Sequence, residues 1–324
     1  MRKLSPIPDS VAVIAATAAI ILQWISPETV ELLRYPVLAI VVLFIGIPHG
    51  SLDHYVTARL YDLPFTIAGQ LGFYLYYLVM VLLMSGIWLY NDLLGFLFFS
   101  VISMYHFGQA DLRHLNIPRR FKAGLYLSRG TMILGLIVFS HIDYTAPVLA
   151  EITSRPILES PFVFANHKLL AFAAFIQYLL FQGILLLVYS RQISTPVYYT
   201  MGDALLVSSL FLLVDPILAF AVYFGAWHSL GHFREMHDFF RSTGPPMSML
   251  ELGVKATPFT LLTLIGLWII YRSNEAFGLE LEMVSLFFIL ISVLTLPHML
   301  IVETMFSHQL EEDMQTRKPE SFSY

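Results

Sequence analysis

The sequence predicts an all-α protein, a polytopic transmembrane helical bundle of about ten spans, with eight or nine spans as alternatives. Three observations predict this fold: 57% of the 324 residues are hydrophobic, only 13% are charged, and the mean hydropathy is +0.71. In soluble domains about 45–50% of residues are apolar and about a quarter are charged. We therefore expect a multi-pass protein of the cell membrane.

Ten apolar segments follow one another along the chain. Several approach the roughly 20 residues that a helix needs to cross the hydrocarbon core, while the first, fourth, seventh and ninth are shorter. Asn91-Asp92 and Asp215-Pro216 interrupt the pattern and predict tight turns, although the second would also fit a kink within one long helix. The segments are residues 10–26, 35–52, 67–90, 93–110, 123–142, 167–189, 200–214, 216–236, 255–271 and 283–305.

The basic residues predict that both ends of the chain are cytoplasmic. Most of the 18 Lys and Arg residues fall in segments that are cytoplasmic when the N-terminus is inside, whereas Arg129 falls within the fifth apolar segment. No small-residue cleavage site precedes Pro27, so we expect the first span to be retained. No repeat or linker divides the chain, which predicts one integral membrane domain, residues 1–324, with a short polar cytoplasmic tail at about 307–324.

Charge and cysteine content exclude several classes of function. The net charge is −5, with an acidic run near the C-terminus, which argues against nucleic-acid binding. The chain has no Cys, so it has no disulfide, no thiolate metal ligand and no Cys nucleophile. Any metal site must use other donors.

Four histidines near the inner ends of predicted spans give the clearest indication of function: His49, His106, His228 and His232. With the N-terminus inside, the second, fourth and eighth spans all run inward, so these imidazoles are expected at one depth. His228 and His232 are four residues apart and share one helical face. Ionisable side chains are costly near the hydrocarbon core of a membrane and are usually functional there. Binding of a shared metal ion is the function that best explains these imidazoles.

Other polar residues accompany these histidines. Asp53 and Asp111 follow His49 and His106 by about one turn and would orient imidazoles as hydrogen-bond acceptors. Pro48 and its neighbouring glycines are expected to break the helix and aim His49 inward. Two further histidines compete for the same positions and are interpreted first as supporting or structural residues, with ligation by either left open: His54 and His298. A single intramembrane histidine is more often a hydrogen bonder between helices than a metal ligand.

A four-histidine site would suit oxygen chemistry. Neutral imidazoles leave one or two positions of a five- or six-coordinate metal open for O₂ or substrate. Imidazole suits iron, zinc, copper or nickel, so the spacing alone does not select the metal. Because the chain has neither thiolates nor a haem-attachment motif, a non-haem Fe(II) oxygenase acting on a lipid in an apolar cavity is favoured.

Three alternatives stay open from the residues alone. Membrane di-iron desaturases and hydroxylases share the spaced histidine pair, but they need further boxes with adjacent histidines, and this chain has no His-His dipeptide. A bis-histidine haem protein would place its histidines on facing helices around a porphyrin. A transporter could use intramembrane His and Asp as a proton relay, and it need hold no stoichiometric iron.

Four motifs resemble the Brp/Blh family of bacterial and archaeal membrane β-carotene 15,15′-dioxygenases. The motifs are GIPHGSLDH at 46–54, YHFGQAD at 105–111, WHSLGHF at 227–233 and LPHM at 296–299. They occur in order from the second predicted span to the last, with no gross departure from the family pattern. The first span and the long loops carry none of the resemblance.

The resemblance implies Fe²⁺-dependent cleavage of the central 15,15′ double bond of β-carotene by O₂ within membrane lipid, giving two molecules of all-trans-retinal for a rhodopsin partner. It implies iron ligation by His49, His106, His228 and His232. No catalytic residue is then needed beyond the metal centre. Asp53, Asp111 and Glu303 would tune the imidazoles. Aromatic side chains would line the substrate tunnel, although aromatic clusters in membrane helices more often serve packing. The candidates are Tyr105, Tyr223, Phe224 and Trp227, together with Tyr74, Tyr76 and Tyr77.

Overall fold

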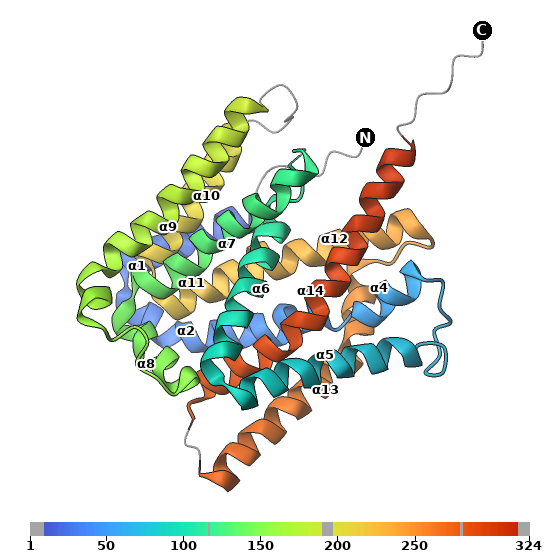
Figure 1. Cartoon of the computed structure of the whole chain (residues 1–324), viewed down its shortest axis with the longest axis horizontal. Helices are drawn as coiled ribbons and strands as arrows, with labels where there is room; N and C mark the ends of the chain where they lie inside the picture. The colour runs from blue at the N-terminus through green and yellow to red at the C-terminus, as the bar shows by residue number, and fades with distance from the viewer. Residues whose placement is uncertain (1–9, 116, 190–196, 279–280, 317–324) are drawn as a thin grey trace.

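The structure is a computed structural model that describes residues 10–115, 117–189, 197–278 and 281–316, and these residues contain helices but no strand. The all-α prediction is confirmed (Figure 1). The helices are α1 Ser10–Ile25, α2 Pro27–Val41, the π-helix η1 Val42–Gly46, α3 Ile47–Gly50, α4 Asp53–Leu60, α5 Leu71–Tyr90, α6 Asp92–Leu112, α7 Arg119–Ser140, α8 Ile142–Thr153, α9 Pro161–Val188, α10 Val197–Leu213, α11 Pro216–Val222, the π-helix η2 Tyr223–Ser229, α12 Leu230–Thr243, α13 Met249–Phe277 and α14 Met283–Thr316.

Seven helices of the described residues are long and apolar enough to cross a membrane. Two shorter apolar helices, Ser10–Ile25 and Tyr199–Leu213, and the continuous run α11–η2–α12 coincide with the three remaining predicted segments. Each of the ten predicted segments therefore corresponds to a helix. The protein is a helical membrane bundle, and the number of crossings stays a prediction.

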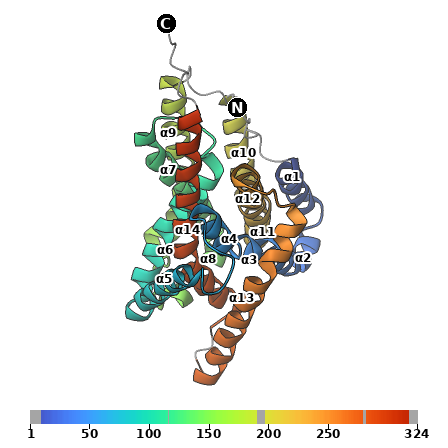
Figure 2. The ribbon, with the colours of Figure 1, turned by 90° about the vertical axis from the view of Figure 1, so that its right-hand side faces the viewer.

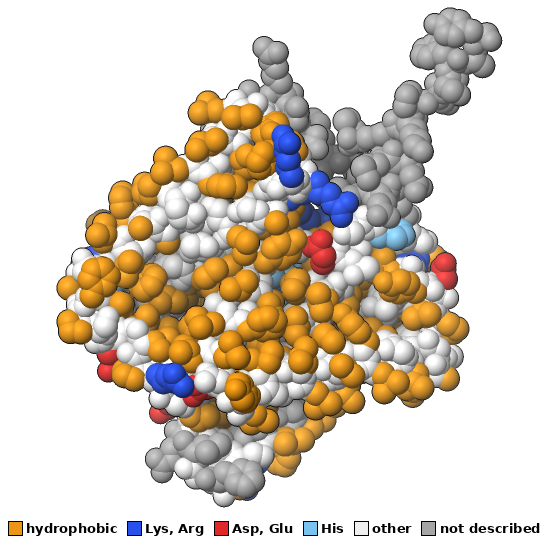
Figure 3. Space-filling view, viewed as in Figure 1, with side chains coloured by type: hydrophobic (Ala, Val, Ile, Leu, Met, Phe, Trp, Pro, Cys, Tyr) orange, Lys and Arg blue, Asp and Glu red, His pale blue; other side chains and the backbone are white. Residues whose placement is uncertain are grey.

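Hydrophobic side chains cover most of the visible face of the molecule, and charged side chains on it are few (Figure 3). Many large apolar side chains are exposed, among them Leu89 at 89% and Trp24 at 86%. Such a surface is unfavourable in water and is expected where helices face lipid. The bundle thus presents its apolar side chains both to its core and to the bilayer.

Several predicted boundaries are corrected. The second helix begins at Pro27 rather than near residue 35, because Pro27 fits the first turn of a helix and Glu28 complements the helix dipole there. Helix α8 lies between the predicted segments 123–142 and 167–189, where no helix was predicted, and it buries Ile142 and Leu149 against the bundle. Helix α14 continues into the predicted polar tail as far as Thr316, and residues 317–324 lie outside the described residues.

Both predicted turns are helix ends. Helix α5 ends at Tyr90, and the Asn91 side chain caps α6 by accepting the backbone N–H of Leu94 at 2.9 Å. Asp215 caps α11 in the same way, since its carboxylate accepts the backbone N–H groups at the start of that helix. A capped helix start at Asp215 excludes the alternative of one long kinked helix.

Helices α6 and α7 approach each other closely through glycines. A Cβ atom on Gly108 would overlap the backbone of Tyr126, and a Cβ atom on Gly130 would overlap the backbone of Met104. Small residues permit such contacts between membrane helices. Because α6 carries His106, this contact fixes one wall of the site described below.

We expect Gly108→Ala to lower the thermal unfolding midpoint of the purified protein markedly, because backbone rather than a flexible side chain would have to move. The matched control is Gly183→Ala on α9, where an added Cβ would meet no atom within 4 Å. Alanine has the better helix propensity by about 1 kcal/mol, so the control should melt with the parent or slightly above it. Equal midpoints for the two variants would contradict the close contact.

Candidate metal centre

Five buried imidazoles, carried by α3, α6, η2, α12 and α14, meet between the helices: His49, His106, His228, His232 and His298. Each has at least one neighbouring ring centroid 4.9 to 5.2 Å away, with the paired ring planes at 79° to 89°. None of the five is more than 7% exposed. The structure therefore brings together the four histidines favoured by the sequence and adds His298; we call the five the histidine cluster.

The ring spacing in the histidine cluster fits ligands of one metal ion. An imidazole nitrogen lies about 2.1 Å from a bound metal, which places ring centroids on neighbouring coordination positions about 4.6 to 5.3 Å apart. Five pairs of rings lie 4.9 to 5.2 Å apart, within that range, and the rings of His49 and His232 lie slightly beyond it at 5.6 Å. Buried imidazoles that served only as core side chains would be expected to have hydrogen-bonded nitrogens.

Two of these rings are held through Nδ1, which leaves Nε2 as the free nitrogen. Nδ1 of His298 hydrogen-bonds to the Asp53 carboxylate at 2.9 and 3.1 Å. Nδ1 of His49 hydrogen-bonds to the backbone carbonyl of Gly46. In metal-binding histidines, the N–H of the ring nitrogen that does not bind the metal usually donates a hydrogen bond to a carboxylate or a carbonyl in this way, which fixes the tautomer and the ring orientation.

Several nitrogens of the histidine cluster have no partner. Within the described part of the chain, both ring nitrogens of His106, Nδ1 of His228 and Nε2 of His298 are buried without a hydrogen bond. Unpaired buried polar atoms are costly, and a bound ion would satisfy one nitrogen of each ring that it contacts. Among the described residues, no group of three or more His, Asp or Glu side chains has its donor atoms arranged to hold a metal ion. Ligation would therefore require the rings to turn toward the ion.

Two π-helical turns shape the site. His49 follows η1, and His228 lies within η2. These two turns pack against each other: Gly46 lies against the Phe224 ring, and Gly225 lies against Val41. The helical run from α2 to α4 contains the π-helical turn η1 just before Pro48 and a short interruption after Gly50. The predicted break is therefore displaced from Pro48 itself to these two positions. Local π-helical turns are frequent at functional sites.

Two carboxylates lie against imidazoles of the histidine cluster. Asp53, predicted to orient an imidazole, hydrogen-bonds to His298. Glu235, which the sequence interpretation missed, lies 3.5 Å from Nδ1 of His232 and 2.5 Å from Nε of Arg113. Its position three residues after His232 was the signal that could have identified it.

The prediction that Asp111 and Glu303 orient imidazoles is corrected. Asp111 contacts Arg129. Glu303 accepts hydrogen bonds from the Tyr105 hydroxyl at 3.0 Å and from the Gln109 side-chain amide. Each carboxylate is therefore engaged by groups outside the histidine cluster.

A buried ion triad lies beside η2 and was also missed. Arg129 is 0% exposed, and its Nη2 lies 2.8 Å from Asp111 and 2.6 Å from Asp203. Trp227 donates its indole N–H to Asp203 at 2.8 Å, and the Tyr223 hydroxyl donates to Asp111 at 3.3 Å. The triad therefore holds two aromatic residues of the π-helical turn that carries His228.

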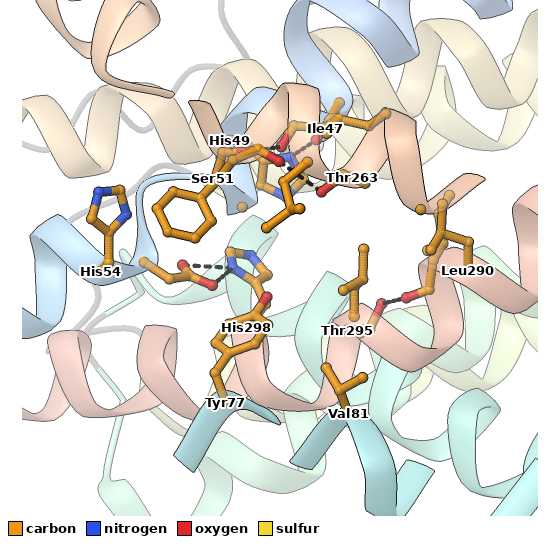
Figure 4. A pocket seen from close by; sticks show the side chains of 18 of the residues that line it. Ile47, His49, Ser51, His54, Tyr77, Val81, Thr263, Leu290, Thr295 and His298 are labelled. Atoms are coloured by element: carbon orange, nitrogen blue, oxygen red, sulfur yellow. Dashed lines mark hydrogen bonds and ion pairs between the residues drawn. The ribbon is translucent and has the colours of Figure 1, made fainter. Parts of the chain in front are cut away.

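An apolar cavity of about 820 Å³ reaches the histidine cluster. Small-molecule sites usually occupy about 300–1,000 Å³. The cavity is lined by every imidazole of the cluster except His232. Figure 4 shows His49 and His298 at its wall, with His54 to one side and Thr295, Val81 and Leu290 to the other.

His54 lies apart from the cluster, because its ring packs on Phe259 with centroids 4.5 Å apart and on Tyr55 at 4.3 Å. It lines the cavity rather than joining the five imidazoles. A regular helix turn from Asp53 onward points it away from His49.

Only part of the predicted aromatic wall lines the cavity. Phe224 lines it, as do Tyr74 and Tyr77 from α5. Tyr76 does not line it and is 42% exposed on the outside of α5. Three further candidates are corrected, because buried hydroxyl and indole groups need hydrogen-bond partners and theirs are carboxylates away from the cavity. They are Tyr105, Tyr223 and Trp227.

Comparison with known proteins identifies the family. The family model of beta-carotene 15,15′-dioxygenase matches residues 40–306, which include the whole histidine cluster. The chain belongs to the beta-carotene 15,15′-dioxygenase family. This membership confirms the resemblance seen in the motifs and makes the protein a carotenoid-cleaving dioxygenase of the membrane.

Two relatives of this dioxygenase cover most of its length. The probable beta-carotene 15,15′-dioxygenase Blh of Halobacterium salinarum is 28% identical over 324 residues, which cover 90% of this chain and 89% of that protein. A beta-carotene 15,15′-dioxygenase of an uncultured marine bacterium is 26% identical over 267 residues, which cover 82% of this chain and 91% of that protein. No solved structure matches the chain.

Proposed function

We propose that this dioxygenase cleaves the central 15,15′ double bond of β-carotene with O₂ to give two molecules of all-trans-retinal, at one Fe²⁺ ion held by His49, His106, His228 and His232. One observation carries the proposal: buried imidazoles with unpaired nitrogens form the wall of an apolar cavity. The names of the two relatives support the substrate. Retinal of this origin would serve a rhodopsin in the same membrane.

The donor set fits iron in a dry site. Neutral imidazoles suit iron among the first-row metals, and the chain offers no thiolate that would favour a softer ion. Fe²⁺ bound there would supply the activation of O₂ that an apolar polyene cannot provide for itself. The side chains of the chain supply the rest: they hold the ligands, exclude water and position the substrate.

Positioning must come from the walls of the cavity, because a symmetric hydrocarbon offers no polar group for the protein to hold. The cavity extends to both sides of His298, toward His54 in one direction and toward Leu290 in the other (Figure 4). A cavity that continues on both sides of the ligands suits a cut in the middle of a long substrate. No side chain has to act as a general acid or base in this account.

Metal content tests the proposal. Elemental analysis of the purified protein should find close to one iron per chain. Removing iron with a chelator should abolish conversion of β-carotene, and adding Fe²⁺ should restore it. Active protein that holds no iron would contradict the proposed centre, and inactive protein without iron would favour the transporter alternative.

We expect Asp53→Asn to weaken iron binding by about 10-fold, the low end of the effect of outer hydrogen-bond partners in other metal sites. The effect is indirect, because Asp53 holds His298, and the His298 ring lies against the rings of His49, His106 and His232. The substitution keeps the size of the side chain but removes the charge that faces Nδ1 of His298 at 2.9 Å. Iron per chain, measured over a series of chelator concentrations, gives the affinity. The matched control is Asp238→Asn, which removes a carboxylate 3.5 Å from the ring of His237, a histidine outside the cluster. An unchanged affinity in the Asp53 variant would remove this carboxylate from the support of the centre.

A further inference from the structure

The cavity has an opening on the outer surface of the helix bundle. Most of its lining residues are buried or half-buried, but Ile67 is 79% exposed, Leu78 is 52% exposed and Leu262 is 59% exposed. A side chain that lines a cavity and is also exposed marks the place where the cavity opens. Leu78 lies on α5 and Leu262 lies on α13, so the opening lies between these two helices, and it extends toward the connection before α5 that holds Ile67.

The packing of the helices leaves room for this opening. Helix α5 packs against α4, α6 and α14, whereas α13 packs against α3, α12 and α14. The two helices meet near one end of the cavity, where the rings of Tyr74 and Phe259 stack with centroids 6.0 Å apart. In Figure 2, α13 runs separately from α5, and its lower end extends beyond the other helices.

The opening lies at the level of the hydrocarbon core if α5 and α13 both cross the membrane. Both helices are candidate membrane spans, Leu71–Tyr90 and Met249–Ala276. Leu78 lies about 10 Å along α5 and Leu262 about 20 Å along α13 at 1.5 Å per residue, so neither is close to an end of its span. An exposed leucine at that depth faces lipid tails rather than water.

The walls behind the opening are suited to a hydrocarbon. The same cavity that Leu78 and Leu262 line is also lined by Val81, Leu290 and His298. Asp53 is the one charged side chain among the described lining residues, and its carboxylate is hydrogen-bonded to His298. A charged or strongly polar ligand would lose its hydration along this path without compensation.

We propose that Leu78 and Leu262 form a lateral mouth through which the carotenoid substrate enters from the hydrocarbon core of the bilayer. The identity of the ligand rests on the proposed function, while the position of the mouth rests on the exposure and packing of α5 and α13. An uncharged polyene dissolved in lipid would reach the histidine cluster through this mouth without crossing water.

The absence of native cysteine allows a direct test. Leu78→Cys and Leu262→Cys are each made in the full chain, reconstituted in lipid nanodiscs and labelled with a bulky methanethiosulfonate reagent that a reducing agent removes. Each labelled variant should lose most of its retinal formation, regain it on reduction and keep its iron throughout. The matched controls are the neighbouring Val79→Cys and Leu261→Cys, which are 56% and 54% exposed in the parent and do not line the cavity.

A second readout does not depend on activity. β-Carotene in the nanodisc should slow thiol labelling at positions 78 and 262 relative to positions 79 and 261. Equal effects of the label, and equal protection by carotenoid, at mouth and control positions would overturn the lateral mouth even in an active enzyme. If the unlabelled variants and the parent form no retinal, the proposed reaction fails, and the protection pattern still decides whether a polyene occupies the mouth.

Discussion

Retinal formation should fall below detection when any one of His49, His106, His228 or His232 is changed to Ala. Loss of one imidazole removes a donor from a buried site in which no Cys can replace it. The effect should exceed the roughly 10–100-fold cost of losing an outer-shell partner, because the ligand itself is lost. Conversion of β-carotene by equal amounts of purified protein, with iron per chain measured on the same samples, checks this expectation.

His54→Ala is the matched control for these four variants. His54 is 8% exposed and lines the same cavity, but its ring packs on Phe259 rather than on the histidine cluster. We expect this variant to keep its iron and to lose only part of its activity through altered cavity shape. If His54→Ala loses iron like the other four, or if one of the four retains iron and activity, the ligand assignment is wrong.

Arg129→Met should destabilise the protein by about 3–5 kcal/mol, the usual cost of removing one partner from a buried ion pair. Arg129 is 0% exposed and lies within 2.8 Å of Asp111 and within 2.6 Å of Asp203, so its loss leaves two carboxylates facing each other without a cation. The yield of folded protein and its thermal unfolding midpoint in detergent measure the effect.

A triple variant separates the effect of unpaired charge from the effect of lost side-chain packing. Arg129→Met combined with Asp111→Asn and Asp203→Asn removes all three charges while keeping side chains of similar size. Replacing a complete buried ion network by neutral groups is often close to neutral, so the triple variant should recover much of the midpoint lost by the single variant. Equal loss in both would show that packing, not unpaired charge, explains the role of Arg129.

The helical architecture was largely predictable, because hydrophobicity over about 20 residues is a local property of the sequence. Each of the ten apolar segments corresponds to a helix. Helix α8 was missed because Asp143 and Pro147 gave its sequence the appearance of a loop, and only tertiary packing shows that Ile142 and Leu149 are buried. The start of helix α2 at Pro27 was missed because Glu28 and Arg34 interrupt the hydrophobic pattern of its first turns.

The histidines of the site were identifiable, but the partners of their supporting residues were not. His228 and His232 are neighbours on one helix, so their pairing follows from spacing. Asp53 was predicted to orient an imidazole, but the sequence did not show that this imidazole is His298, a residue far away in the chain. Side-chain partners across helices depend on helix rotation, which the π-helical turns η1 and η2 alter locally.

The aromatic residues illustrate the same limit. Tyr223, Phe224 and Trp227 lie within one turn of the chain, but only Phe224 lines the cavity. The other two donate hydrogen bonds to Asp111 and Asp203 on the opposite side. Their orientation depends on Asp111 and Asp203, which both form ion pairs with Arg129. A single sequence does not show that these three residues, which lie far apart in the chain, are in contact.

The most direct test of the account is chromatographic retinoid analysis of β-carotene-producing cells that express this chain, beside cells that express equal amounts of the His106→Ala variant. Loss of β-carotene pigment with retinal as the sole cleavage product in the parent, and intact β-carotene in the variant, is the predicted result. Unchanged β-carotene in cells with well-expressed, iron-loaded parent protein, or apocarotenals of other lengths, would contradict central cleavage at the histidine cluster.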